Sequence, residues 1–208
     1  MVDYKVDSPF ATPIYKSTLS VPDSVYLDLK SEPVVRSPSD NGSFLRIEHK
    51  EKYTLLIEEI GKHVKGYMDW IFHADKKYTY ACNGAWVNKH DPGDITFEHA
   101  HCHALVSGIF YIDIPEPAEK AGPLTFIDHS FYPFTEFFNI HFDQYNSFNS
   151  KRITYIPRKG DIYLFPSHLK HSVGANMTSF ERWSMAFDFT ITTPLSHSTN
   201  MMTILPTK

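Results

Sequence analysis

Short strand-like segments, each ended by glycine or proline, follow one another from about residue 77 to the end of the chain. They are rich in aromatic and β-branched residues and comprise Tyr78–Asn88, Ile95–His99, Ala104–Asp113, Leu124–Asp128, Ile153–Ile156, Asp161–Phe165 and Arg182–Ile191. The breaks include Pro92-Gly93, Gly122-Pro123 and Gly160. Many short strands at this spacing are typical of a sandwich or barrel. We therefore predict a mainly β fold.

The residues before this region follow a different period. Apolar residues recur at helical spacing between Leu56 and Ile71, which predicts an amphipathic helix over Lys50–His73. The first forty residues are rich in proline and serine, and residues 34–42 contain turn signals. A chain of 208 residues suits one domain. We divide the single domain 1–208 into an N-terminal extension with its helix (1–76) and a β core (77–192).

An aromatic insertion, residues 129–150, interrupts the strand pattern of the core. It contains eight phenylalanine and tyrosine residues between Phe131 and Phe148. Connections of this length are usually functional or disordered, and this one is too aromatic for a disordered segment. We expect it to act as a lid over a functional site; the alternative is a packing insertion.

Composition excludes several classes of partner. The net charge is −4 with neutral histidines, and no long basic run offers a surface for nucleic acid. No apolar run reaches the roughly 18 residues of a membrane span. The start of the chain lacks the pattern of a secretory leader, and two cysteines make no disulfide framework. We therefore expect a cytoplasmic protein.

Three alternating histidines, His99, His101 and His103, are the most informative motif. On a strand, residues two apart point to the same face, so either neighbouring pair could chelate one metal ion. A third ligand must come from elsewhere, and His171, after the turn that ends the segment Asp161–Phe165, is the candidate. The alternative interpretation of the triplet is a solvated strand face.

A second motif, Arg182-x-Ser184, lies just downstream of His171. Both side chains share one strand face. A guanidinium can grip a carboxylate at two points, and a neighbouring hydroxyl adds a third contact. The pair suits an anionic co-substrate whose other end chelates the metal, although an exposed strand arginine is the commoner origin of such a pattern.

Taken together, these residues resemble a bacterial and phage branch of the 2-oxoglutarate and iron(II)-dependent oxygenases, and the resemblance covers most of the chain. The matching segments, in order, are Thr12-Pro13-Ile14-Tyr15, Trp86-Val87-Asn88, His99-x-His101, Ser107-Gly108-Ile109-Phe110-Tyr111, Phe165-Pro166-Ser167 with His171, and Arg182-x-Ser184. The resemblance implies a double-stranded β-helix of the jelly-roll or cupin-like type, with the N-terminal helix packed on it.

The resemblance also implies the chemistry. Iron(II) is expected on His99, His101 and His171, and 2-oxoglutarate is the co-substrate that yields succinate and CO2 while O2 oxidises a primary substrate. The far carboxylate of 2-oxoglutarate is expected on Arg182 and Ser184, with Asn88, Ser107 and Tyr111 as further contacts. The primary substrate, a protein side chain or a metabolite, is not readable from the motifs.

Two departures from the wider superfamily matter. His101 occupies the place where most such oxygenases carry Asp or Glu, so the site lacks the usual carboxylate ligand. His168 stands where the branch usually has an aromatic residue, and we expect it to line the site rather than bind iron. His103 is expected one pleat beyond the ligands, as a pocket residue.

Two other functions are compatible with the same motifs. A cupin-type dioxygenase that does not use 2-oxoglutarate would suit three histidines, and Gly93 before His99-x-His101 resembles the first cupin motif. That interpretation lacks the expected glutamate after His101 and gives Arg182 no role. A non-catalytic jelly-roll protein that binds a metal is the third hypothesis.

Overall fold

The computed structural model describes residues 11–37, 42–128 and 141–193. Before the β core it contains two helices, a 3-10 turn and three short strands. In chain order these are β1 (Tyr15–Thr18), α1 (Asp23–Lys30), β2 (Val35–Arg36), β3 (Ser43–Arg46), η1 (Glu51–Tyr53) and α2 (Thr54–Trp70). None of the described helices is long and apolar enough to span a membrane.

Eight strands and one 3-10 turn make up the rest of the described chain. They are β4 (Tyr80–His90), β5 (Thr96–His99), β6 (Val106–Asp113), η2 (Ala118–Lys120), β7 (Leu124–Ile127), β8 (Arg152–Tyr155), β9 (Asp161–Pro166), β10 (His171–Val173) and β11 (Arg182–Ile191). All seven segments predicted as strands are strands in the structure, with ends shifted by up to two residues.

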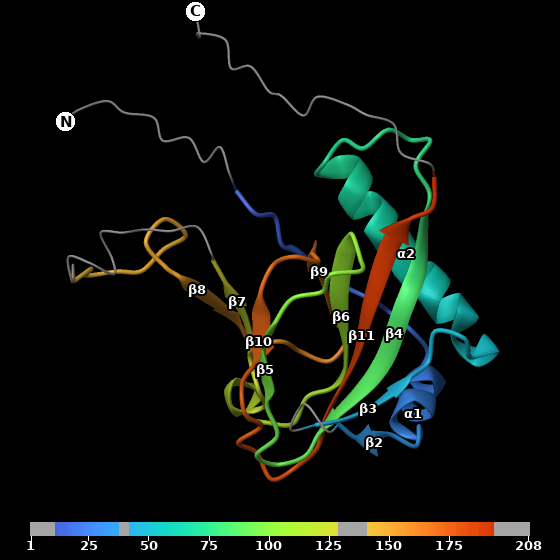
Figure 1. The fold of residues 1–208 in the computed structure, drawn as a ribbon. Helices are drawn as coiled ribbons and strands as arrows, with labels where there is room; N and C mark the ends of the chain where they lie inside the picture. Colours follow the sequence, from blue (N-terminus) through green and yellow to red (C-terminus); the bar gives the residue numbers. More distant parts are fainter. Residues whose placement is uncertain (1–10, 38–41, 129–140, 194–208) are drawn as a thin grey trace, which may run out of the picture.

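The strands form two antiparallel sheets, as expected for a jelly roll (Figure 1). The larger sheet has the order β1-β9-β6-β11-β4-β3-β2, and the smaller has the order β5-β10-β7-β8. Sequence neighbours are often not sheet neighbours, because the chain alternates between the two sheets. This crossing places β5 and β10, which are far apart in sequence, side by side.

Alternation along the strands divides the core into two layers. Phe110, Met185 and Phe187 point to the outer face of the larger sheet and pack with Ile60 and Val64 of α2. Their neighbours on the same strands point between the two sheets, where a second cluster joins both: Ile109, Tyr111, Tyr163 and Phe165 meet Leu124, Phe126 and Val173. The period of two therefore fixes which residues can reach an internal site.

The predicted helix over 50–73 is present as η1 and α2. The sequence interpretation missed β10, α1 and the strands β1 to β3. These elements are short, and β1 and β3 are held by pairing to β9 and β4 rather than by their own pattern. Of the predicted lid, residues 129–140 lie outside the described residues, and residues 141–150 contain no helix or strand.

Candidate active site

Three histidines meet between the two sheets. His99 ends β5, His171 begins β10, and their Cα atoms are direct partners in the ladder. His101 lies two residues beyond β5, where its backbone N–H donates to the carbonyl of Ser167 at 2.9 Å. Each ring offers a nitrogen atom, and these atoms all lie within 4.8 Å of one another. The structure thus brings together the three residues predicted as metal ligands.

Hydrogen bonds fix the orientation of each ring. Nδ1 of His99 lies 2.8 Å from the carbonyl oxygen of Phe97, and Nδ1 of His171 lies 3.0 Å from that of Leu169. Nδ1 of His101 contacts both carboxylate oxygens of Asp188, at 2.8 and 2.9 Å. All these partners are acceptors, so Nδ1 carries the proton and the lone pair of each ring stands on Nε2. This is the arrangement in which imidazoles bind metals.

The environment favours the neutral ring at His171. Burial, assisted by the charge that His99 would carry, lowers the pKa of His171 to about 3. A neutral imidazole is the form that donates to a metal ion. Trp86 stacks on His101 with ring centroids 5.6 Å apart, which further restricts that ring. Three oriented nitrogen donors fit a divalent transition metal such as iron(II).

The expectation that His101 and His103 continue the strand was wrong. β5 ends at His99, and His101 bonds to Ser167 instead of extending the ladder. His103 is exposed, belongs to no metal-binding group in the described chain and does not line the cavity. His168 is also exposed and does not line the cavity, contrary to expectation. It lies in the turn that precedes β10.

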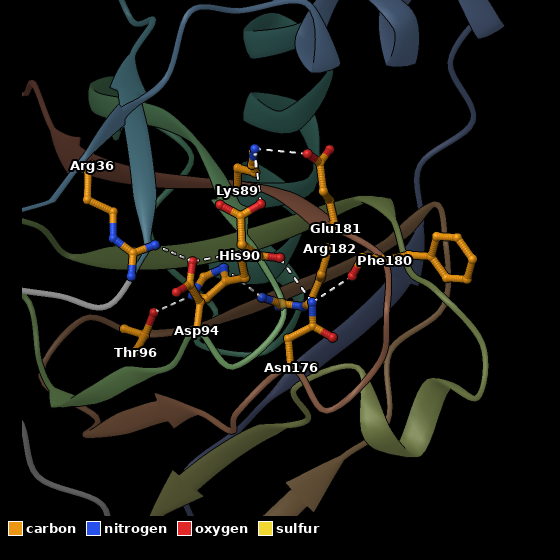
Figure 2. A network of polar contacts seen from close by, with 10 residues as sticks. Arg36, Lys89, His90, Asp94, Thr96, Asn176, Phe180, Glu181 and Arg182 are labelled. Carbon is orange, nitrogen blue, oxygen red and sulfur yellow. Dashed lines mark hydrogen bonds and ion pairs between the residues drawn. The ribbon is translucent and has the colours of Figure 1, made fainter.

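The charged end of the site is Arg182 on β11, which is only 1% exposed. Its Nη1 lies 3.3 Å from Nδ1 of His90 (Figure 2), and its guanidinium stands over the ring of Tyr111 at 5.2 Å. Nε and Nη2 have no hydrogen-bond partner in the described structure. Burial lowers the pKa of Arg182 from its usual value, yet guanidinium remains charged in proteins. Arg182 is therefore a buried cation with two nitrogen donors, Nε and Nη2, that have no acceptor among the described residues.

Register explains how the polar side chains gather around this arginine. Arg182 is the Cα partner of His90, and Ser184 is the partner of Asn88, across the β4–β11 pair. All four line one cavity of about 330 Å³, which the three histidines also line. Such a volume suits a small ligand. The structure thus places the three histidines and the predicted carboxylate site in one pocket.

His90 is a functional candidate that the sequence interpretation missed. Arginine only donates, so Nδ1 of His90 accepts from it, and Nε2 donates to Thr96 Oγ1 at 2.8 Å. Burial, and then the charge of Arg182, lower the pKa of His90 to about 3. A neutral imidazole can therefore steady the guanidinium without competing for an anion. The alternation of β4, with Asn88 facing inward, was a signal that could have identified His90.

Ser107 and Tyr111 do not line the cavity but lie behind its wall. Ser107 Oγ donates to Asp188 Oδ1 at 2.6 Å and lies 2.9 Å from Ser167 Oγ. Tyr111 is fully buried, and burial raises the pKa of its hydroxyl to about 12. In this structure the two residues support Asp188 and Arg182, respectively, rather than reach the space for a ligand.

Comparison with models of protein families gives a match. The model of the family described as "Putative 2OG-Fe(II) oxygenase" matches residues 84–188, which is half of the 208-residue chain. This stretch contains His99, His101, His171 and the Arg182-x-Ser184 motif. No curated protein matches the chain in sequence.

Several solved structures share the fold at low sequence identity. A prolyl-4-hydroxylase from Pseudomonas putida is 12% identical, with a TM-score of 0.60 over 86% of this chain and 92% of that one. HygX from Streptomyces hygroscopicus, solved with nickel and 2-oxoglutarate bound, is 11% identical, with a TM-score of 0.61 over 86% and 83%. A viral collagen prolyl hydroxylase from Paramecium Bursaria Chlorella virus-1 is 16% identical, with a TM-score of 0.52 over 85% and 94%.

Proposed function

The chain belongs to the 2OG-Fe(II) oxygenase family, and we propose that His99, His101 and His171 hold its iron(II). The protein is an iron(II)- and 2-oxoglutarate-dependent oxygenase, with 2-oxoglutarate and O2 as co-substrates. We further propose that Arg182, Ser184 and Asn88 bind the carboxylate of 2-oxoglutarate that lies far from the metal. Bound iron supplies the oxidising chemistry, while the protein supplies placement and a protected pocket.

The main support for the proposed carboxylate site is that the guanidinium of Arg182 has no ionic partner among the described residues. A buried charge without a partner is costly, and proteins keep such a charge where a ligand neutralises it. Arg182 has no carboxylate within hydrogen-bond reach among the described residues, and its Nε and Nη2 are unused. Two adjacent N–H donors match the two oxygens of one carboxylate. The hydroxyl of Ser184 and the amide of Asn88, both on the cavity wall, provide neighbouring donors.

The roles of the remaining residues follow from their contacts. Phe97, Leu169 and Asp188 hold the imidazole protons on Nδ1, so the ligand nitrogens are already oriented before a metal binds. His90 and Tyr111 hold Arg182 in place from two sides. Phe165 and Val173, from the cluster between the sheets, make part of the cavity wall apolar, which helps to exclude bulk water from the reacting groups.

The test is a pair of titrations of the purified protein. Iron(II) and 2-oxoglutarate are titrated under nitrogen, each in the absence and presence of the other. We expect each ligand to tighten the other, because 2-oxoglutarate would contact both the metal and Arg182 and the coupling is reciprocal. With O2 admitted, 2-oxoglutarate should be converted to succinate. Iron binding that is indifferent to 2-oxoglutarate would instead support a three-histidine dioxygenase of the cupin type.

A further inference from the structure

The side chain of Asp188 lies directly behind the metal-binding group, although no sequence motif pointed to it. It is on β11, on the same inward face as Arg182 and Ser184. Both of its carboxylate oxygens contact Nδ1 of His101, at 2.8 and 2.9 Å. Ser107 donates to one of these oxygens at 2.6 Å and so fixes the carboxylate from the other side.

The partner of Nδ1 in His101 is a carboxylate, that of Asp188. His99 and His171 donate to backbone carbonyls, which carry no net charge. Among the described residues, the ion-pair partner of Asp188 is His101, and the side chain of Asp188 is 15% exposed. The negative charge of Asp188 therefore acts on one imidazole, and no lysine or arginine of the described chain forms an ion pair with it.

His101 is also the residue that replaces the usual carboxylate ligand. Three neutral imidazoles would leave a bound divalent cation with its full charge of +2, whereas two histidines and a carboxylate reduce the local charge to +1. A carboxylate hydrogen-bonded to the far side of a ligand histidine makes that histidine a stronger donor and adds negative charge near the metal. The negative charge that is absent from the ligand position is thus present on Asp188, which is hydrogen-bonded to that ligand.

We propose that Asp188 is a positioning residue for the metal, whose carboxylate acts through His101 and replaces the negative charge of the absent carboxylate ligand. This inference rests on the proposed function, since it assumes that His101 binds iron(II). It assigns Asp188 two effects. The carboxylate raises the affinity of the site for divalent metal, and it lowers the reduction potential of the bound Fe(III)/Fe(II) couple, because negative charge stabilises the more highly charged ion.

The first test is Asp188→Asn, which keeps the size and an oxygen acceptor but removes the charge. Fe(II) and, separately, Co(II) are titrated into the metal-free protein under nitrogen by calorimetry. We expect a loss of affinity of about 10- to 100-fold, the usual range when the partner of a ligand histidine is altered. The reduction potential of the bound iron should rise. The control is Asp113→Asn. Asp113 ends β6, at the far end of that strand from Ser107, so the loss of its charge should change neither the affinity nor the potential.

The second test exchanges the position of the charge. In a His101→Asp background the ligand itself carries a carboxylate, and Asp188 becomes a like charge beside it. Since this ligand has no ring N–H for Asp188 to accept from, Asp188→Asn should lower Fe(II) affinity far less in this background than in the wild-type protein. Because a general loss of stability caused by the asparagine would lower the affinity in both backgrounds, it cannot produce this difference.

The outcomes separate the inference from the proposed function. If the wild-type protein binds neither Fe(II) nor Co(II), the proposed metal site is wrong and the inference is lost with it. If the wild-type protein binds Fe(II) and Asp188→Asn binds it equally well at an unchanged potential, the metal site stands and the role of Asp188 is refuted. The same conclusion follows if Asp188→Asn lowers the affinity equally in both backgrounds.

Discussion

Replacement of Arg182 by leucine tests the carboxylate site directly. Leucine removes the buried guanidinium while keeping an apolar side chain of moderate size. Two nitrogens of Arg182, Nε and Nη2, have no partner within the described structure and are the groups assigned to 2-oxoglutarate. A hydrogen bond to a charged group contributes about 1.5–3 kcal/mol. Loss of this contact should therefore weaken 2-oxoglutarate binding by about ten- to hundredfold, since roughly 1.4 kcal/mol corresponds to a factor of ten.

The same substitution should leave the unliganded protein intact. A buried charge without an ionic partner is a cost to folding, and its replacement by an apolar side chain is often neutral or stabilising. We expect the melting temperature of Arg182→Leu without ligand to equal or exceed that of the wild-type protein. Saturating 2-oxoglutarate should raise the melting temperature of the metal-loaded wild-type protein but have little effect on that of the variant.

The assay is calorimetric titration of 2-oxoglutarate into the Fe(II)-loaded protein under nitrogen. Arg182→Lys serves as a matched variant, because lysine keeps the charge but cannot present two parallel donors, and its affinity should fall between those of the wild-type protein and the leucine variant. Arg152→Leu, on the exposed strand β8, should bind 2-oxoglutarate normally. If Arg182→Leu binds 2-oxoglutarate as tightly as the wild-type protein, the carboxylate site is wrongly placed.

Three further predictions follow from the same geometry. Replacement of His99, His101 or His171 by alanine should nearly abolish iron(II) binding, whereas His103→Ala should retain its metal, as metal analysis of the purified variants can show. For His90 the folded pKa of about 3 lies below the ordinary value of 6.5, so the unfolded chain takes up the proton first and stability falls as the pH drops below about 6.5. The loss of unfolding free energy between pH 7 and pH 5, measured with urea, should thus be about 2 kcal/mol smaller in His90→Gln; an identical loss would contradict the buried neutral ring. Gly108→Ala would place a Cβ atom 2.4 Å from the ring of Phe187 and 2.6 Å from the carbonyl oxygen of Tyr163, so a destabilisation of at least about 1–3 kcal/mol is expected in thermal melts.

Several parts of the site could be predicted because local pattern is sufficient for them. Strand alternation places Arg182 and Ser184 on one face. Glycine and proline residues between the strands place the predicted strand ends within two residues of the observed ends. The choice of His99 over His103 rests on the resemblance and on Gly93, which lies where a turn into this strand is expected, since alternation alone fits either pair equally well. Residues 129–140 of the predicted lid lie outside the described part of the chain.

Other residues could not be found because their roles depend on partners distant in sequence. Asp188 lies 87 positions from His101, and a lone aspartate on a strand gives no local signal for such a contact. His90 is identified only by its register opposite Arg182. The expectation that His101 continues the strand was wrong for the same reason: its backbone N–H bonds to Ser167, in a turn far along the chain, instead of extending the ladder.

The sequence by itself therefore determined the class of fold, the ligand types and the chemistry they suit, because periodicity and residue type are properties of short segments. Only the tertiary structure decided which polar groups are satisfied. The pairing of β5 with β10 brings His99 next to His171, and the pairing of β4 with β11 places His90 opposite Arg182. No carboxylate of the described chain forms an ion pair with that arginine. Whether a charge is paired depends on every segment that packs around it, which no single stretch of sequence contains.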